Sequence, residues 1–418
     1  MKIPSIASRI KKGDSTGKPW VSQGHLVIIA SFFAMVLTMG VYFTFGIFIK
    51  SINAELGWSR STISGAFSVA WIVNGILSIL AGAINDRFGP RLVITVSGLL
   101  SGTGYLLISR ISSEWQLYLF FGLIVGAGSS IFIPLTSTIA RWYLKNRSAM
   151  TGIAISGIGI GSFIMPPIAN SLILHYTWRT AFSILGIALL VVVVIAAQFL
   201  KKEPTRKIGS TQLNNVETIN NDQETRSKKK VFKEVITTSQ FWLFFSMLVC
   251  LGFVFFAIQI HLPPYATDKG ISPNSAANIL AVMGGAGIIG RIVFGNLGDN
   301  MGNRKTFMLG FAFMSVAMYW LLTAENTWSL YIFAIVFGIS YGNCVTQESP
   351  LVATIFGLKS HGLVFGLIST GFSLGSAIGP YVAGQIFDLT GSYDYAFMAS
   401  AGIITLGLVL NILLPKQR

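Results

Sequence analysis

Two ionisable residues lie inside long apolar stretches of this sequence, Arg291 in 274–297 and Glu348 in 328–354. Arg291 stands eight residues before Asp299. That spacing is about 12 Å along a helix, which is far for a side chain that must reach water. A guanidinium binds a carboxylate through two parallel hydrogen bonds, so Arg291 predicts recognition of a small organic anion. The alternative is a structural ion pair.

Glu348 is expected at nearly the same depth as Arg291. A carboxylate beside an arginine is ionised, and it takes up a proton more readily once that arginine turns to a substrate anion. Glu348 is therefore a candidate proton carrier, unless it faces a vestibule and only holds a helix. His261, near the end of the stretch 240–264, is a second candidate, although a single histidine at a helix end is usually a hydrogen-bonded structural residue.

Uncharged polar side chains near the middle of the apolar stretches could complete a binding pocket. They are Tyr42, Ser130, Tyr341, Asn343 and Gln347. Their alternative role is to bridge helices, which polar side chains also do in membranes. No phosphate loop, zinc-ligand spacing, catalytic triad or nucleotide fingerprint occurs in the sequence. We therefore expect no enzyme, no cofactor and no metal.

The composition requires a membrane. Of 418 residues, 52% are hydrophobic and only 11% are charged, whereas soluble domains carry about 25% charged residues. One soluble core cannot hide that much apolar surface. In lipid, each backbone amide must be satisfied within its own segment, so the long apolar stretches predict helices.

The apolar stretches predict twelve membrane-spanning helices in an all-α membrane protein. They cover 24–50, 61–83, 90–109, 115–140, 149–173, 180–200, 240–264, 274–297, 304–323, 328–354, 362–386 and 394–415. The only long polar segment, 201–239, is typical of a flexible linker. The expected organisation is an N-terminal segment (1–23), a six-helix bundle (24–200), the linker (201–239), a second six-helix bundle (240–415) and a short C-terminus (416–418).

The basic residues predict the orientation. The net charge is +15, but no basic stripe interleaves with exposed aromatic residues, so nucleic acid is not an expected partner. Lys and Arg gather in the N-terminal segment, the linker and every second short loop. The other loops hold only Lys50, Arg60, Arg110, Arg179 and Lys269. The positive-inside rule then places both termini and the linker in the cytoplasm.

Two loops repeat each other at one constant spacing. Gly82, Asp86, Gly89 and Arg91 are matched by Gly295, Asp299, Gly302 and Arg304. Such self-similarity is typical of a transporter built from two repeats with a substrate site near their interface. An aspartate at a helix end can pair with an arginine of a facing loop. Asp86, Arg87, Arg91, Asp299 and Arg304 are therefore predicted to form a gate at the cytoplasmic side, with a static helix cap as the alternative.

A second repeated set consists of glycines that precede a proline. Gly152, Gly157, Gly161 and Pro166 correspond to Gly366, Gly371, Gly375 and Pro380. Glycines along one helix face permit close packing, which suits a helix against the other half or ordinary packing of small residues.

The repeated loop resembles the signature of the major facilitator superfamily, and the resemblance covers the whole chain. Further segments resemble the bacterial monocarboxylate-porter branch, near the oxalate–formate antiporters. They are Gly46 to Lys50 with Gly57-Trp58-Ser59-Arg60, Ala140 to Tyr143, Trp178 to Phe182, and His261 to Ser272.

The resemblance implies the major facilitator fold, with two pseudo-symmetric six-helix bundles. It also implies that an arginine of the eighth helix binds the substrate carboxylate, and Arg291 matches that arginine. Where animal monocarboxylate transporters carry an aspartate and a lysine, this chain shows Gly287 and, by a loose alignment, Phe43; uncharged residues near Ser369 replace the oxalate porter's lysine. A single fixed positive charge favours a monoanion and leaves the proton site open.

Together these features predict a secondary active transporter for a small monocarboxylate such as lactate or pyruvate, coupled to a proton. It is expected to act as a monomer in a bacterial cytoplasmic membrane. The alternatives are a major facilitator exporter or exchanger of another organic anion, metabolite or drug, and a transporter-like membrane sensor.

Overall fold

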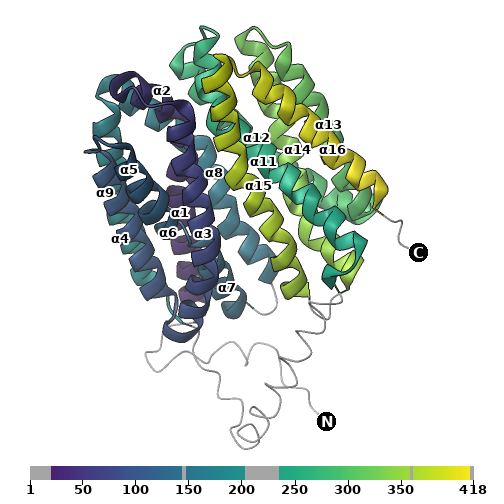
Figure 1. The fold of residues 1–418 in the computed structure, drawn as a ribbon. Coiled ribbons are helices and arrows are strands. Elements are labelled where there is room, and N and C mark those ends of the chain that lie inside the picture. The colour runs from purple at the N-terminus through teal and green to yellow at the C-terminus, as the bar shows by residue number, and fades with distance from the viewer. Residues whose placement is uncertain (1–19, 144–146, 203–234, 358–360, 415–418) are drawn as a thin grey trace, which may run out of the picture.

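The computed structural model describes residues 20–143, 147–202, 235–357 and 361–414. Within these residues the chain forms helices and no strands, so the predicted all-α class is confirmed (Figure 1). The first half holds α1 (Trp20–Phe43), α2 (Phe45–Leu56), α3 (Arg60–Phe88), α4 (Pro90–Ile108), α5 (Glu114–Leu117), η2 (Tyr118–Val125), α6 (Gly126–Gly128), α7 (Phe132–Trp142), α8 (Arg147–His175) and α9 (Trp178–Phe199). The second half holds α11 (Ser239–Asp268), α12 (Pro273–Met301), α13 (Asn303–Leu322), α14 (Thr327–Phe356), α15 (His361–Thr390) and α16 (Asp394–Leu413).

The long helices agree with the twelve predicted spans. Within the described residues, 11 helices are long and apolar enough to cross a membrane. The remaining long helix is α15, with 30 residues. The predicted membrane fold is thus confirmed, with the first span divided into α1 and α2 and the fourth into α5 to α7.

The fourth span is less regular than its apolar sequence suggests. It contains the π-helix η2 and then a turn at Ser129 and Ser130. The Ser129 hydroxyl donates to Gly126 O at 2.9 Å, so these serines compete with the helical backbone pattern. Side-chain competition of this kind is not visible in hydropathy, which explains why the sequence predicted one continuous helix.

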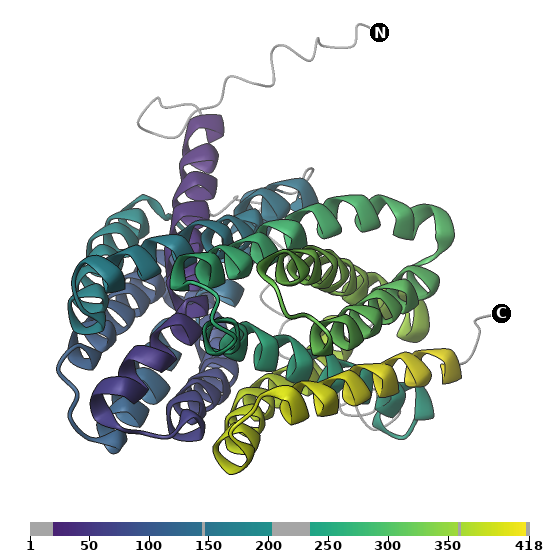
Figure 2. The same ribbon diagram turned by 90° about the horizontal axis from the view of Figure 1, so that it is seen from above.

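The two halves lie side by side, α1 to α9 in purple and blue and α11 to α16 in green and yellow (Figures 1 and 2). Their internal packing repeats: α8 packs on α1 as α15 packs on α11, and α4 on α9 as α13 on α16. Arg91 Nε donates to Gln198 Oε1 at 2.8 Å, and Arg304 Nη2 donates to the carbonyls of Asn411 and Ile412 at 3.2 and 3.1 Å. The repeated arginines therefore tie equivalent helices together in each half.

The repeated glycines pack within their own half. A Cβ atom placed on Gly157 would lie 2.6 Å from Phe32 O of α1, and one on Gly371 would lie 2.7 Å from Phe245 O of α11. Any side chain there would clash with backbone. Of the two readings of this glycine set, the contacts favour ordinary close packing over a moving contact between the halves.

The halves pack most extensively through α3 with α15, α8 with α12, and α2 with α11. We call the end at which the linker 201–239 connects α9 with α11 the linker end, and the opposite end the distal end. The turns before α3 and α12 and after α11 and α15 lie at the distal end. This arrangement places the middle of α12, and with it Arg291, beside α8 of the other half.

Candidate substrate site

Arg291 lies at the interface between the halves. It projects from α12 towards α8, where its Nη1 would be 3.8 Å from a Cβ atom placed on Gly159. Its Nε is buried and has no hydrogen-bond partner. Among the described residues, no carboxylate oxygen lies within 4.0 Å of the guanidinium. A half-buried arginine whose Nε is buried without a partner is suited to receive an anion, because an unsatisfied buried donor is costly.

Tyr341 and Glu348 accompany Arg291. Both lie on α14 and interact electrostatically with Arg291. The Tyr341 ring stacks on Phe255 of α11 with ring centroids 3.5 Å apart, which fixes the phenol beside the site. Glu348 and Arg291 therefore influence each other electrostatically without forming an ion pair within 4.0 Å.

Close packing of α12 on α14 holds this group in place. A Cβ atom on Gly342 would lie 3.0 Å from Arg291 N, and one on Gly287 would lie 3.5 Å from Gly338 O. Glycines on both helices let the backbones approach. The close approach depends on Gly342, whose added Cβ atom would lie less than 3.0 Å from Gly287 O, whereas one on Gly287 makes only an ordinary contact.

An aromatic layer between the halves lies on the distal side of Arg291. The Trp71 ring of α3 is 4.4 Å from Phe256 of α11 and 6.5 Å from Phe372 of α15. Phe43 and Phe67 also contact Phe256, at 5.9 and 5.6 Å. The Trp71 Nε1 is buried without a partner. Sequence reasoning missed this layer, because aromatic residues in a membrane helix look alike whether they face lipid, core or partner half.

Asn343 and Gln347 do not join the group around Arg291. Asn343 is fully buried and donates through Nδ2 to Thr306 O of α13 at 2.7 Å. Gln347 is buried and donates through Nε2 to Phe294 O of α12 at 2.7 Å. Both amides bridge helices within the second half, which is the alternative that the sequence left open.

Tyr42 and Ser130 lie within the first half. Tyr42 is buried, stacks on Phe121 at 5.7 Å and leaves its hydroxyl unpartnered. The Ser130 hydroxyl is 3.3 Å from Asn74 O, to which it donates. The structure gives neither a contact with Arg291, so their part in a pocket stays a prediction.

His261 is fully buried near the distal end. Its Nε2 donates to Pro380 O at 2.8 Å, and its Nδ1 is 2.9 Å from the Tyr393 hydroxyl. A carbonyl only accepts, so Nε2 carries a hydrogen and a neutral ring accepts from Tyr393 through Nδ1. Both ring nitrogens are thus occupied by structural bonds, away from Arg291.

The predicted gate residues lie at the linker end. Arg141 of α7 donates to Asp86, and Lys202 Nζ donates to Arg87 O at 3.1 Å, so these bonds stay within the first half. The side chain of Asp299 is outside the described residues. The gating role of both loops remains a prediction.

Two repeated bundles of long apolar helices, with an arginine at their interface, are the architecture of a membrane transporter. The chain belongs to the Major Facilitator Superfamily, whose sequence profile matches residues 31–297 and 266–418. The resemblance to the superfamily is confirmed.

Similar proteins agree with the class. Monocarboxylate transporter 13 of Rattus norvegicus is 25% identical over 403 residues, covering 96% of this chain and 91% of that protein. Monocarboxylate transporter 2 of Homo sapiens is 26% identical, covering 94% and 87%. These relatives are transporters, in line with the expectation that this chain is not an enzyme.

Solved structures show the same fold. A bacterial homologue of the human lysosomal transporter Spinster, in an inward-facing and unoccupied conformation, superposes with a TM-score of 0.78 at 14% identity, covering 94% of this chain and 97% of that one. The nucleoside transporter NupG superposes with a TM-score of 0.74 at 14% identity, covering 94% and 100%.

Proposed function

We propose that this protein is a secondary transporter of a small monocarboxylate such as lactate or pyruvate, and that a proton moves with the substrate. The two six-helix bundles, 24–200 and 240–415, are the bodies that rock around the site. The observation that carries the proposal is the buried Arg291 Nε at the interface of the halves, which has no protein partner.

Arg291 is the substrate ligand in this proposal, and Tyr341 forms a wall of the site. Among the described residues, no second basic side chain acts on Arg291 or Glu348, and a single guanidinium suits one carboxylate group. The names of the similar animal proteins support this substrate class.

Glu348 is the proposed proton carrier, because it shares the electrostatic environment of Arg291. When substrate takes the guanidinium, Glu348 loses its only nearby positive partner among the described residues and becomes easier to protonate. His261 is the weaker candidate, since both its ring nitrogens are engaged.

An exchanger of another organic anion is the second candidate. The replacement of the animal transporters' aspartate by Gly287 favours it, because the residue pair expected from the resemblance is incomplete here.

Purified protein in proteoliposomes tests the proposal. Uptake of labelled lactate, pyruvate, oxalate and a neutral metabolite is measured with and without a pH gradient. Faster uptake with the gradient indicates that a proton moves with the substrate. Uptake of monocarboxylates that exceeds uptake of oxalate and the neutral compound supports the assignment. Equal uptake of the neutral compound would contradict the monocarboxylate assignment.

We further propose a cytoplasmic linker, cytoplasmic termini, a bacterial cytoplasmic membrane and a monomeric working form. The basic linker and termini support the orientation.

A further inference from the structure

The hydrogen bonds that join the two halves within the described residues lie towards the distal end. They connect Arg60 and Ser61 with Asp388, Arg60 with Asp268, Asn170 with Asn274, and Gln259 with Phe43. Towards the linker end, Gly152 of α8 and Gly366 of α15 have no heavy atom within 4 Å of an added Cβ. The halves are therefore held together at the distal end.

Charge at this end is divided between the halves. The cations Lys50 and Arg60 come from α2 and α3, and the anions Asp268 and Asp388 come from α11 and α15. Arg60 Nη1 is 2.5 Å from Asp268 Oδ2, and Lys50 Nζ is 3.2 Å from Asp268 Oδ1. Both ion pairs thus cross from one half to the other and must break if the halves separate here.

Asp388 adds a backbone connection. Its two carboxylate oxygens accept from Arg60 N at 3.0 Å and Ser61 N at 2.8 Å, the first amides of α3. A carboxylate at a helix N-terminus is favourable because these amides have no partner in their own helix. One half thereby caps a helix of the other.

Arg60 is held on an aromatic platform. Its side chain is 8% exposed, and its guanidinium carbon lies 3.8 Å from the Phe387 ring centroid and 5.1 Å from that of Tyr393. His261 fixes Tyr393 through the 2.9 Å bond described above. Low exposure makes the Arg60 pair stronger than a pair on an open surface.

The repeat-related contact has no charge. Ser61 corresponds to Asn274 at the spacing that relates the two repeated loops, so the α3–α15 contact corresponds to the α12–α8 contact. There Asn170 Nδ2 donates to Asn274 Oδ1 at 2.7 Å. The two distal contacts are thus equivalent in the fold, but only one carries ion pairs.

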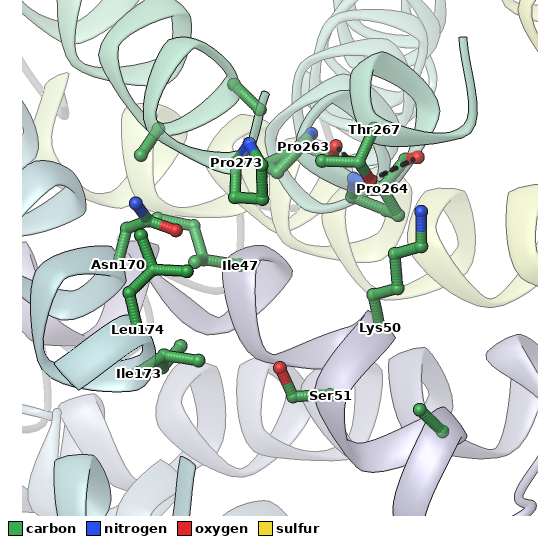
Figure 3. A pocket seen from close by; sticks show the side chains of 13 residues that line it. Ile47, Lys50, Ser51, Asn170, Ile173, Leu174, Pro263, Pro264, Thr267 and Pro273 are labelled. Atoms are coloured by element: carbon green, nitrogen blue, oxygen red, sulfur yellow. Dashed lines mark hydrogen bonds between the residues drawn. The ribbon is translucent and has the colours of Figure 1, made fainter. Parts of the chain in front are cut away.

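A cavity of about 240 Å³ lies beside these contacts, between α2, α8, α11 and α12 (Figure 3). Lys50 extends along it from α2, Asn170 lines it from α8, and Pro264 and Thr267 line it from α11 (Figure 3). Ala277 of α12 also lines it and is 1% exposed. A probe at Ala277 is therefore covered while the distal contacts hold.

We propose that Lys50, Arg60, Asp268 and Asp388 form a one-sided electrostatic latch that holds the distal end closed, and that each transport cycle must break it. The proposal rests on the alternating-access part of the proposed function. It assigns a role to Gly57-Trp58-Ser59-Arg60 and to His261 to Ser272, two segments whose purpose the substrate site does not explain.

The test measures how fast a cysteine at Ala277 reacts with a bulky hydrophilic maleimide in detergent, where both faces are accessible and no substrate is present. The parent protein without Ala277→Cys gives the background from the buried Cys250 and Cys344. Asp388→Asn and Arg60→Gln should each raise the labelling rate roughly tenfold or more, since each removes charge-assisted bonds across the halves. The matched control Asn274→Ala, at the uncharged contact, should change the rate much less.

A double-mutant cycle keeps the test decisive if one variant is poorly folded. Arg60→Gln and Asp268→Asn should be strongly non-additive in labelling rate, whereas Arg60→Gln and Asn274→Ala should be nearly additive. Unchanged labelling in Asp388→Asn and Arg60→Gln, or an equal rise in Asn274→Ala, overturns the latch. Because the readout needs no substrate, failure of carboxylate transport leaves it unaffected.

Discussion

Gly159 of α8 faces Arg291 of α12 across the two halves, with 3.8 Å between a Cβ atom on Gly159 and Nη1 of the guanidinium. The missing side chain lets α12 approach α8 closely here, because a Cβ atom on Gly159 would lie less than 3.0 Å from Ile288 Cγ1.

A methyl group added at Gly159, beside Arg291, should make the transporter more selective for small substrates. In Gly159→Ala the new methyl group crowds Ile288 and approaches Arg291, so binding of pyruvate should fall more than binding of formate. Gly152→Ala, on the same helix with nothing within 4 Å, is the matched control and should bind both normally. Isothermal titration with the two anions provides the measurement, and equal losses for both would contradict a size limit at Gly159.

Arg291 itself should be irreplaceable for binding. Arg291→Lys keeps the charge but loses the paired donors, so affinity for a monocarboxylate should drop more than about tenfold, as expected for a lost charge-assisted bond of about 1.5–3 kcal/mol. Arg291→Ala should abolish binding. Arg110→Lys, at an exposed distal loop, is the control. Normal carboxylate binding by Arg291→Ala would contradict the monocarboxylate proposal and favour the alternative, an exchanger of another compound.

Substitution of Glu348 should separate substrate binding from proton coupling. Glu348→Gln resembles the protonated form, so the variant should still bind lactate and exchange it across the membrane. It should lose accumulation driven by a pH gradient. Counterflow and gradient-driven uptake, measured on the same proteoliposomes, distinguish the two. If gradient-driven uptake persists in Glu348→Gln, the proton travels elsewhere, with His261 or the substrate acid as the remaining carriers.

The linker-end loop should act in gating rather than in binding. Asp86→Asn removes the ion pair with Arg141, and if the pair supports closure of the linker end, transport should fall several-fold with unchanged substrate affinity. A cysteine at Ile288 should then react faster with reagents from the linker side. Arg141→Gln should reproduce the effect. Unchanged reactivity in both variants would make the pair a static contact between α3 and α7.

The orientation is tested by one cysteine at Asn215, a linker position outside the described residues. It should resist an impermeant thiol reagent in intact cells and react in inverted vesicles, because the basic linker favours the cytoplasmic side. Labelling from outside would reverse the assignment of the linker end and the distal end to the two faces of the membrane.

The sequence by itself determined the membrane class, the helical spans and the repeat, and it singled out Arg291 as the candidate substrate ligand. These features depend only on the local sequence. A long apolar stretch must form a helix in lipid, and a charged side chain inside it is energetically costly, so an arginine there indicates a functional role. The repeat is likewise visible without the fold, because Gly82 and Gly295 begin two loops with the same residue spacing.

Only the tertiary structure decided which polar residues meet. Asn343 and Gln347 precede Glu348 by a few residues, yet their amides turn to neighbouring helices while Glu348 is oriented to interact with Arg291. Successive residues of a helix point about 100° apart, so neighbouring side chains of α14 face different helices. The packing of α12, α13 and α14 decides which helix each side chain faces. The meeting of Arg60 with Asp388, 328 residues apart, depends in the same way on how α3 packs against α15.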